Sequence, residues 1–422
     1  MKQRYARTVL DGGVRLVTET VPHALSVSIG VWVKTGARHE ARHEAGISHF
    51  TEHLLFKGTR RRSAREIALA LESVGGYLDA FTGRESTCFY AHVLREDLPR
   101  AVDVLADILK NSLLSASSVR REQRVIQDEI KTFEDTPDEL IHDLFASEVW
   151  RGHPLGNPIL GTARSVRAFR PAAVRSYFDR RYSADRVVVA AAGALDPAEV
   201  RDLVERRIRF GIGGPDSAPG APPVFAPALK VVRRALSQEY VCLGVDGLAF
   251  ASRDRYALLL LNALLGGGMS SRLFQKVREE RGLAYTVFSF AEFCADTGLF
   301  GTFAATIPQK AETVVDLVLR EYRRLLRDGI TARELHTAKR LIRGSILFAL
   351  EGVGNRMTKL AKAEIYGQTF LPAPALLARF EATTRDDVMQ LAGRLLDPER
   401  QTLVALGPVS ERRLARVFHG GR

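Results

Sequence analysis

The chain has 422 residues, 46% hydrophobic and 26% charged, which is the balance of a folded globular protein. This length is too great for one ordinary core and favours two domains of roughly 200 residues each. The net charge of +12 invites a nucleic-acid interpretation, but the arginines are spread along helices that also carry Glu and Asp. The densest basic run, Arg60 to Arg62, follows a Gly-Thr turn and resembles a solvated loop. No nucleic-acid partner is therefore expected.

Cysteine usage and apolar runs limit the class of protein further. Cys88, Cys242 and Cys294 form no Cys-x-x-Cys pair, which argues against a disulfide framework and a cysteine zinc site. The charged N-terminus is followed by no apolar core of a secretory signal, and no apolar run is long enough to span a membrane. The expected location is cytoplasmic, with no membrane partner.

In the first half, apolar and turn residues predict strands and helices in alternation. Residues 4–36 predict a hairpin, with strands at 15–19 and 26–33 around a turn at Pro22 and His23. After a helix at 49–56, Ser63 and Glu66 form a capping box that begins a second helix. The remaining elements are a strand-like run at 77–93 with a bend at Thr82 and Gly83, helices at about 97–113 and 116–134, a helix reaching Trp150, a buried strand at 186–193, and a helix from 196 to about 207.

The second half repeats this order after a segment, 211–227, whose Gly and Pro content predicts an extended linker. The repeated elements are strands around 229–246, a helix at 255–265, a strand at 300–303, a helix at 309–327 and a strand at 403–407. We therefore predict an α+β fold of two homologous domains, 1–210 and 228–422, each with a largely antiparallel sheet packed with helices.

The most informative motif is His-Phe-Thr-Glu-His at 49–53. On a helix, His49 and His53 leave the same face one turn apart, as two ligands of one zinc ion require. Glu52 borders that face and could reach a water at the metal. A surface helix that merely carries these residues is the alternative, and the motif alone leaves both open.

A catalytic zinc site needs a third protein ligand, and the helix at 118–130 offers candidates. Glu122 and Glu129 are seven residues apart and share one stripe of that helix, with Asp128 beside the second. The second half has Leu261 to Gly268 in place of the motif and Ser345 near the place of Glu129. One half keeps ionisable residues that its duplicate lacks, so the fold itself does not require them. This difference favours a functional site in the first half.

These residues resemble the inverted zinc motif of the pitrilysin (insulinase) metallopeptidases, in particular single-chain bacterial members related to the mitochondrial processing peptidase β subunit. The resemblance covers essentially the whole chain. It implies one zinc ion bound by His49, His53 and Glu129, with Glu52 as general base and Glu122 supporting the site. The seven-residue step from Glu122 favours Glu129 over Asp128.

The resemblance also implies roles for the second half. Arg278 and Tyr285 resemble a pair that closes over the zinc from the other domain, as in a clamshell, and stabilises the oxyanion. From the residues alone, the alternative is a solvated helix residue and the start of a core strand. The loop at 266–270 resembles a flexible glycine-rich loop that admits substrate, or is simply a helix C-cap followed by a turn.

The run at 77–82 resembles the family's substrate-pairing edge strand, which implies that substrate adds as a strand along Asp79, Ala80, Phe81 and Thr82. Backbone pairing suits many extended peptides, because it does not depend on their side chains. Asp79 stands where the family usually has Asn, which leaves its local contact open.

The predicted function is a zinc endopeptidase that hydrolyses unstructured peptides in a chamber between the two domains. The alternative is a non-catalytic core or partner subunit of a processing-peptidase-like assembly, although such subunits typically lose the zinc residues that are all present here. A homodimer is expected from the resemblance.

Overall fold

The computed structural model describes residues 4–211, 213 and 220–420, which form two compact units. Unit 1 comprises Met1–Lys131, Asn157–Gly220 and Phe348–Phe370, and unit 2 comprises Thr132–Gly156, Ala221–Leu347 and Leu371–Arg422. No helix in the described ranges is long and apolar enough to cross a membrane.

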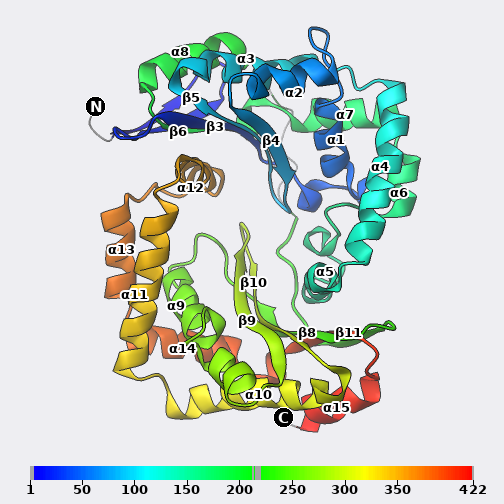
Figure 1. Cartoon of the computed structure of the whole chain (residues 1–422), viewed down its shortest axis with the longest axis vertical. Coiled ribbons are helices and arrows are strands. Elements are labelled where there is room, and N and C mark those ends of the chain that lie inside the picture. Colours follow the sequence, from blue (N-terminus) through cyan, green and yellow to red (C-terminus); the bar gives the residue numbers. More distant parts are fainter. Residues whose placement is uncertain (1–3, 212, 214–219, 421–422) are drawn as a thin grey trace. The chain divides into compact units, whose positions relative to one another are not determined.

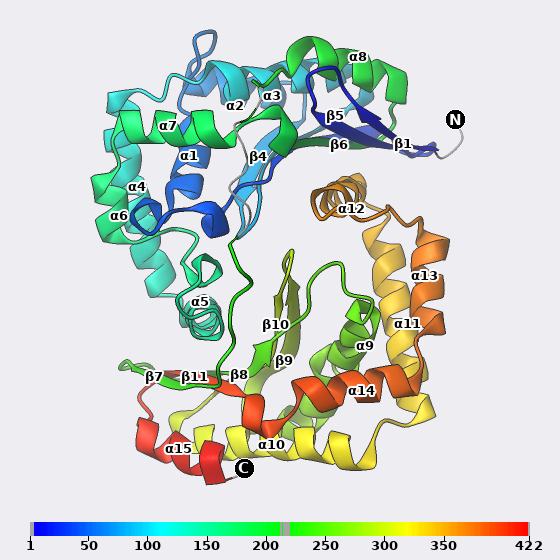
Figure 2. The same ribbon diagram turned by 180° about the vertical axis from the view of Figure 1, so that it is seen from behind.

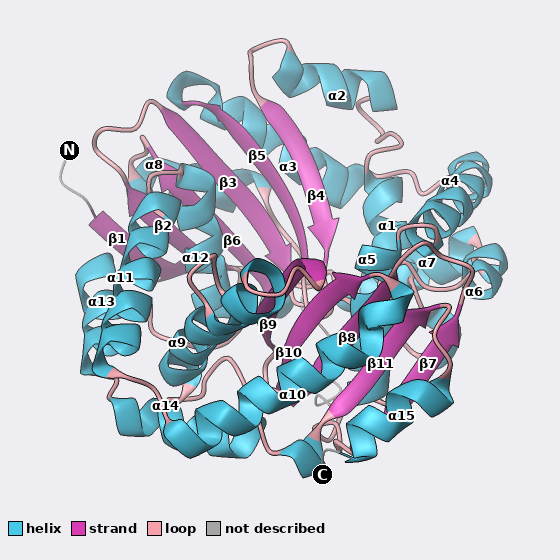
Figure 3. Ribbon diagram, turned by 60° about the horizontal axis from the view of Figure 1, so that its bottom comes forward, coloured by secondary structure: helices cyan, strands magenta, loops and turns pink. Residues whose placement is uncertain are grey.

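The sheet of unit 1 has six strands in the order β1-β2-β6-β3-β5-β4, and all neighbours are antiparallel except β2 and β6 (Figure 3). The strands are β1 (Arg4–Val9), β2 (Arg15–Thr20), β3 (Ser26–Val33), β4 (Tyr77–Thr82), β5 (Thr87–Leu94) and β6 (Val187–Gly193). Every residue of β6 is buried, as expected for an unbroken apolar run in the middle of a sheet. Strand β4 lies at one edge of the sheet.

One strand prediction is wrong, and the structure divides a second predicted run at its predicted bend, Thr82 and Gly83. The predicted hairpin between 15–19 and 26–33 is wrong, because the buried strand β6 lies between β2 and β3 and pairs with both. The hairpin in this region joins β1 and β2 instead. The run at 77–93 is two strands, β4 and β5, which pair around a turn at Gly83.

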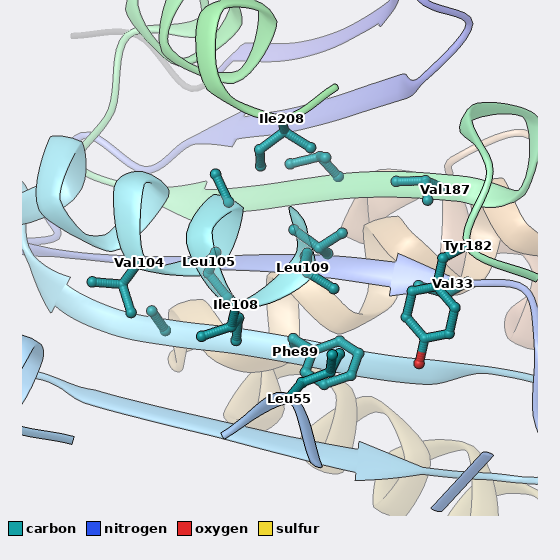
Figure 4. Close-up of a cluster of buried hydrophobic side chains, with 14 of the residues drawn as sticks. Val33, Leu55, Phe89, Val104, Leu105, Ile108, Leu109, Tyr182, Val187 and Ile208 are labelled. Carbon is teal, nitrogen blue, oxygen red and sulfur yellow. The ribbon is translucent and has the colours of Figure 1, made fainter. Parts of the chain in front are cut away.

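Helices α1 (Ile47–Leu55), α2 (Ala64–Glu72) and α3 (Leu98–Asn111) contact strands β3 to β5 of this sheet. Figure 4 shows Leu105, Ile108 and Leu109 of α3 directed at a core that includes Phe89 of β5. The predicted capping box of α2 is confirmed, since Ser63 Oγ accepts the Glu66 N–H while the Glu66 carboxylate accepts the Ser63 N–H. The other helices of this half are α4 (Ala116–Glu134), α5 (Pro137–Val149), α6 (Ala163–Ala168), α7 (Pro171–Arg181) and α8 (Pro197–Arg207).

The basic run before α2 is held against α3. Arg61 contacts Asp103 at 3.1 Å, and Arg62 contacts Asp107 at 2.6 Å. These ion pairs give the run a structural role that accounts for two of its three charges.

The sheet of unit 2 has the order β7-β11-β8-β10-β9, which repeats β2-β6-β3-β5-β4 strand for strand. The one parallel pair, β7 and β11, corresponds to the parallel pair of unit 1, β2 and β6. The predicted α+β fold with two homologous, largely antiparallel sheets is confirmed. The strands are β7 (Leu229–Arg233), β8 (Glu239–Asp246), β9 (Ala284–Phe293), β10 (Gly298–Thr306) and β11 (Thr402–Gly407). The helices are α9 (Arg255–Gly266), α10 (Ala311–Asp328), α11 (Ala332–Ala349), α12 (Val353–Ile365), α13 (Ala373–Ala382), α14 (Arg385–Leu395) and α15 (Glu411–Gly420).

Each sheet is covered on its second face by a helix from the other half of the sequence (Figures 1 and 2). Met357 and Leu360 of α12 pack against Trp32 and Val188 of unit 1, and Ile141 and Phe145 of α5 pack in unit 2. Each compact unit therefore contains segments from both halves of the sequence, whereas the predicted domains, 1–210 and 228–422, are contiguous. Those two ranges remain a prediction of where the repeated halves begin and end. The predicted linker at 211–227 lies partly outside the described residues, at 212 and 214–219.

Candidate metal centre

Helix α1, which carries the His-x-x-Glu-His motif, is anchored firmly at its N-terminus. The Glu40 carboxylate accepts the backbone N–H groups of Gly46 and Ser48 at 2.7 and 2.8 Å. The two carboxyl oxygens satisfy free N–H donors at the start of the helix. Burial raises the pKa of Glu40 to about 7, although these hydrogen bonds lower it in part. Gly46 has φ of 88°, and a Cβ there would lie 2.7 Å from Cα of Gly161, so this backbone contact requires glycine.

The structure brings His49, His53 and Glu129 together, with one ligand atom from each within 4.8 Å of the others. His49 Nε2 lies 3.6 Å from Glu129 Oε1, and His53 Nε2 lies 3.7 Å from Glu129 Oε2. Two ligands that each sit about 2.1 Å from a tetrahedral zinc ion are separated by about 3.4 Å. The observed spacing is close to that value, and it is longer than a hydrogen bond between the same groups would be.

The protonation and pairing of these groups also fit a cation. Burial, with a contribution from the charge of His53, lowers the pKa of His49 to about 3, so its imidazole is neutral at physiological pH. Glu129 Oε2 is buried and has no hydrogen-bond partner in the structure. The neutral imidazole of His49 and the unpartnered carboxylate oxygen of Glu129 are both donors suited to zinc. Within the described part of the chain, this is the one group of His, Cys, Asp or Glu that could hold a metal ion.

Glu122 lies behind His53 and is almost completely buried. Its Oε2 is 3.2 Å from His53 Nδ1 and 3.2 Å from Lys57 Nζ. Burial raises the pKa of Glu122, but the hydrogen bonds from His53 and Lys57 outweigh this, so its pKa is lowered and it is ionised. A carboxylate on Nδ1 fixes the ring so that Nε2 faces the metal position.

Glu52 lies on the same helix, where it is 8% exposed, and one partner holds its side chain. Thr82 Oγ1, at the end of β4, donates a hydrogen bond of 2.5 Å to Glu52 Oε2. Burial raises the pKa of Glu52 to about 7, although the hydrogen bond from Thr82 and the charge of His53 lower it in part. A carboxyl group with this pKa can both accept and release a proton near neutral pH.

Asp128, the neighbour of Glu129, points elsewhere. Its side chain is 74% exposed and contacts Lys131 at 2.9 Å. The geometry therefore distinguishes the two adjacent acids, which the sequence alone could separate only by their spacing from Glu122.

Of the remaining predicted site residues, Asp79, Ala80, Phe81 and Thr82 form most of β4, the edge strand. Arg278 and Tyr285 both lie in unit 2, where the Arg278 guanidinium carbon is 5.0 Å from the centre of the Tyr285 ring. Tyr285 is 77% exposed, so it is not a core residue of β9.

The glycine-rich segment at 266–270 begins as a helix C-terminus. Gly266 is the last residue of α9, and the Gly267 N–H caps the helix on the Ala263 carbonyl. A Cβ on Gly266 would lie 2.2 Å from the Ser289 nitrogen, so close packing against β9 explains this glycine.

Comparisons with known proteins identify the family of this chain. Residues 15–163 match the family Insulinase (Peptidase family M16), and residues 168–342 match the Peptidase M16 inactive domain. The first match contains the whole metal cluster, together with Glu52 and Glu122. The chain belongs to the M16 peptidase family, and the predicted resemblance is confirmed.

Its curated relatives extend over nearly the full chain. A protein of Streptomyces coelicolor named as an uncharacterized zinc protease is 39% identical, with 97% of this chain and 91% of the relative covered. A Bacillus subtilis protein named in the same way is 37% identical, with coverage of 95% and 98%. A crystal structure of a protease from Helicobacter pylori has the same fold, with a TM-score of 0.89, 21% identity, and coverage of 96% and 100%.

Sequence reasoning did not identify two residues that contact the site. Lys57, which holds Glu122, lies four residues after His53, so its helical spacing was a usable signal. Tyr90, whose hydroxyl is 3.2 Å from the Asp79 carboxylate, lies on the neighbouring strand β5, and only the β4–β5 register reveals that contact.

Proposed function

We propose that this chain is a zinc-dependent endopeptidase that hydrolyses unstructured peptides. The observation that carries the proposal is the cluster of His49, His53 and Glu129, with the buried carboxyl group of Glu52 one residue before the second histidine. Membership of the M16 family supports the peptidase class. The complete donor set argues against a non-catalytic partner subunit.

The residues divide the chemistry among themselves. His49, His53 and Glu129 would hold the zinc ion, which when bound supplies Lewis-acid polarisation of a peptide carbonyl and acidifies water. Glu52 accepts the proton of the attacking water and afterwards delivers it to the leaving amine nitrogen. Thr82 orients Glu52 through its hydrogen bond, and Glu122 orients the ring of His53.

Substrate binds to the free edge of β4. One edge of this strand pairs with β5, so the other presents backbone groups to an extended peptide. This mode requires an unfolded segment, because a folded substrate would not offer free backbone groups.

The resemblance adds further predictions. Arg278 and Tyr285 are proposed to stabilise the oxyanion that forms when water attacks the peptide carbonyl. The peptide is proposed to be enclosed between the two domains while it is cleaved. A homodimer and a cytoplasmic location also stay predictions.

Metal removal tests the proposed function directly. Treatment with a zinc chelator is expected to abolish cleavage of an unstructured reporter peptide, and added zinc is expected to restore it. Circular dichroism should show that the fold persists. Cleavage that continues after metal analysis shows zinc to be gone would contradict the proposal.

Replacing Glu122 with Gln is expected to weaken zinc binding by about 10- to 100-fold. The amide is nearly the same size but carries no charge, so His53 and Lys57 both lose an anionic partner. Competition with a chromogenic chelator measures the affinity. Glu134→Gln, at the exposed end of the same helix, is the matched control and should bind zinc as the wild type does.

A further inference from the structure

The side of β4 that faces away from Glu52 carries an acid among aromatic rings. Successive residues of a strand point to opposite faces, so Tyr77, Asp79 and Phe81 share one face, and Thr82, which contacts Glu52, lies on the other. Tyr77, Asp79 and Phe81 are all exposed. Tyr90 of β5 lies directly opposite Asp79 in the sheet register. We call Tyr77, Asp79, Phe81 and Tyr90 the β4 aromatic-acidic surface.

The aromatic rings of this surface are centred on Tyr90. Its ring centre is 6.1 Å from that of Tyr77 and 6.2 Å from that of Phe81, both with edge-on geometry. Their π-faces attract cations as well as apolar groups.

The Asp79 carboxylate in this setting has no counterion. Oδ2 accepts the Tyr90 hydroxyl at 3.2 Å, and Oδ1 accepts the Ala80 N–H at 2.8 Å; both donors are neutral. No Lys, Arg or His nitrogen in the described ranges lies within ion-pair distance of Asp79. Burial lowers the pKa of the nearby His92, so that imidazole is neutral near pH 7 and adds no positive charge.

A negative charge beside accessible aromatic rings is suited to an ammonium or guanidinium group, which gains an ion pair and a cation–π contact together. A peptide strand added to the edge of β4 would direct every second side chain to this face. We propose that Asp79, with Tyr77, Phe81 and Tyr90, selects extended peptides that carry a Lys or Arg side chain on this face. The inference rests on the proposed function, because it assumes that the peptide pairs with β4.

The register along the strand limits where the basic residue falls. Asp79 is three residues from Thr82, the contact of Glu52, which is about 10 Å along an extended chain. The selected side chain is therefore expected about three residues from the cleaved bond.

A positional scan of peptides tests this inference. Each peptide is unstructured and uncharged apart from a single Lys, which is placed in turn at every position within about four residues of the cleaved bond. The matched peptide has Gln at that position. The wild-type enzyme is expected to cleave the Lys peptide with a kcat/KM roughly 3- to 30-fold higher at one favoured position. Binding of the same labelled peptides to the zinc-loaded Glu52→Gln variant is measured by fluorescence anisotropy.

Asp79→Asn, which keeps the shape and removes the charge, is expected to bring the ratio of kcat/KM between the Lys and Gln peptides to about one, whatever its effect on either value alone. Tyr90→Phe keeps the ring and should retain most of the preference. Asp11→Asn, in the exposed turn between β1 and β2, is the matched charge control and should keep all of it.

The inference is overturned if wild-type enzyme shows no Lys preference at any position, or if Asp79→Asn retains it. Failure of the proposed function is a different result, in which zinc-loaded wild-type enzyme cleaves no peptide. In that case the binding measurement still decides the inference, since a Lys preference that requires Asp79 would support it and equal binding of both peptides would reject it.

Discussion

Glu52→Gln is expected to bind zinc like the wild type but to lose peptide cleavage, with a fall in kcat of about 10²- to 10⁴-fold. The amide oxygen can still accept the hydrogen bond from Thr82, so the side chain keeps its position. A neutral amide cannot take a proton from water or pass one to the leaving amine. The measurements are kcat for an unstructured peptide and zinc content by metal analysis.

A matched variant separates this effect from a general loss of charge in unit 1. Glu72→Gln, at the exposed end of α2, removes an equal charge away from the metal cluster and should leave kcat unchanged. Full cleavage by the Glu52→Gln variant would reject the assignment of Glu52 as general base. Loss of zinc from that variant would instead indicate that Glu52 helps to hold the metal.

Local patterns in the sequence predicted much of this fold. The spacing of Ile47, Phe50 and Leu54 predicted α1, and all three are buried in the core of unit 1. The all-apolar run at 186–193 predicted a buried strand, which β6 is. These predictions succeed because helix periodicity and continuous burial depend on residues close in sequence.

Long-range pairing could not be read in the same way. The insertion of β6 between β2 and β3 joins segments more than 150 residues apart, and no local pattern encodes that choice. Met357 likewise packs with Trp32 because α12, which comes from the second half of the sequence, belongs to unit 1. Helix α12 carries an ordinary amphipathic pattern, which shows that one face is buried but not against which sheet.

The candidate site falls between these cases. The step of four residues from His49 to His53 and of seven from Glu122 to Glu129 placed each pair on one helix face. That the two helices meet at a common point could be expected from the family resemblance but not from spacing. The structure supplies that meeting through the contact of Glu122 with His53 and the approach of Glu129 to both histidines.

Glu129→Gln is expected to lose most bound zinc, whereas Asp128→Asn should retain it. The two acids are adjacent on α4, so both variants remove one charge from the same turn. Glu129 approaches Nε2 of His49 with Oε1 and Nε2 of His53 with Oε2, which has no hydrogen-bond partner. Asp128 is exposed and contacts Lys131. An amide is a weak zinc ligand, so only the first variant removes a ligand from the cluster.

Zinc stoichiometry and thermal unfolding together test this difference. Zinc that binds only the folded chain raises the free energy of unfolding, so adding zinc to the apoprotein should raise Tm for the wild type and for Asp128→Asn. Glu129→Gln should show little rise at the same concentration, with a Tm close to that of wild-type apoprotein. Equal zinc content in all three proteins would refute the ligand set of His49, His53 and Glu129. Loss of zinc from Asp128→Asn alone would instead assign Asp128 as the third ligand and reject Glu129.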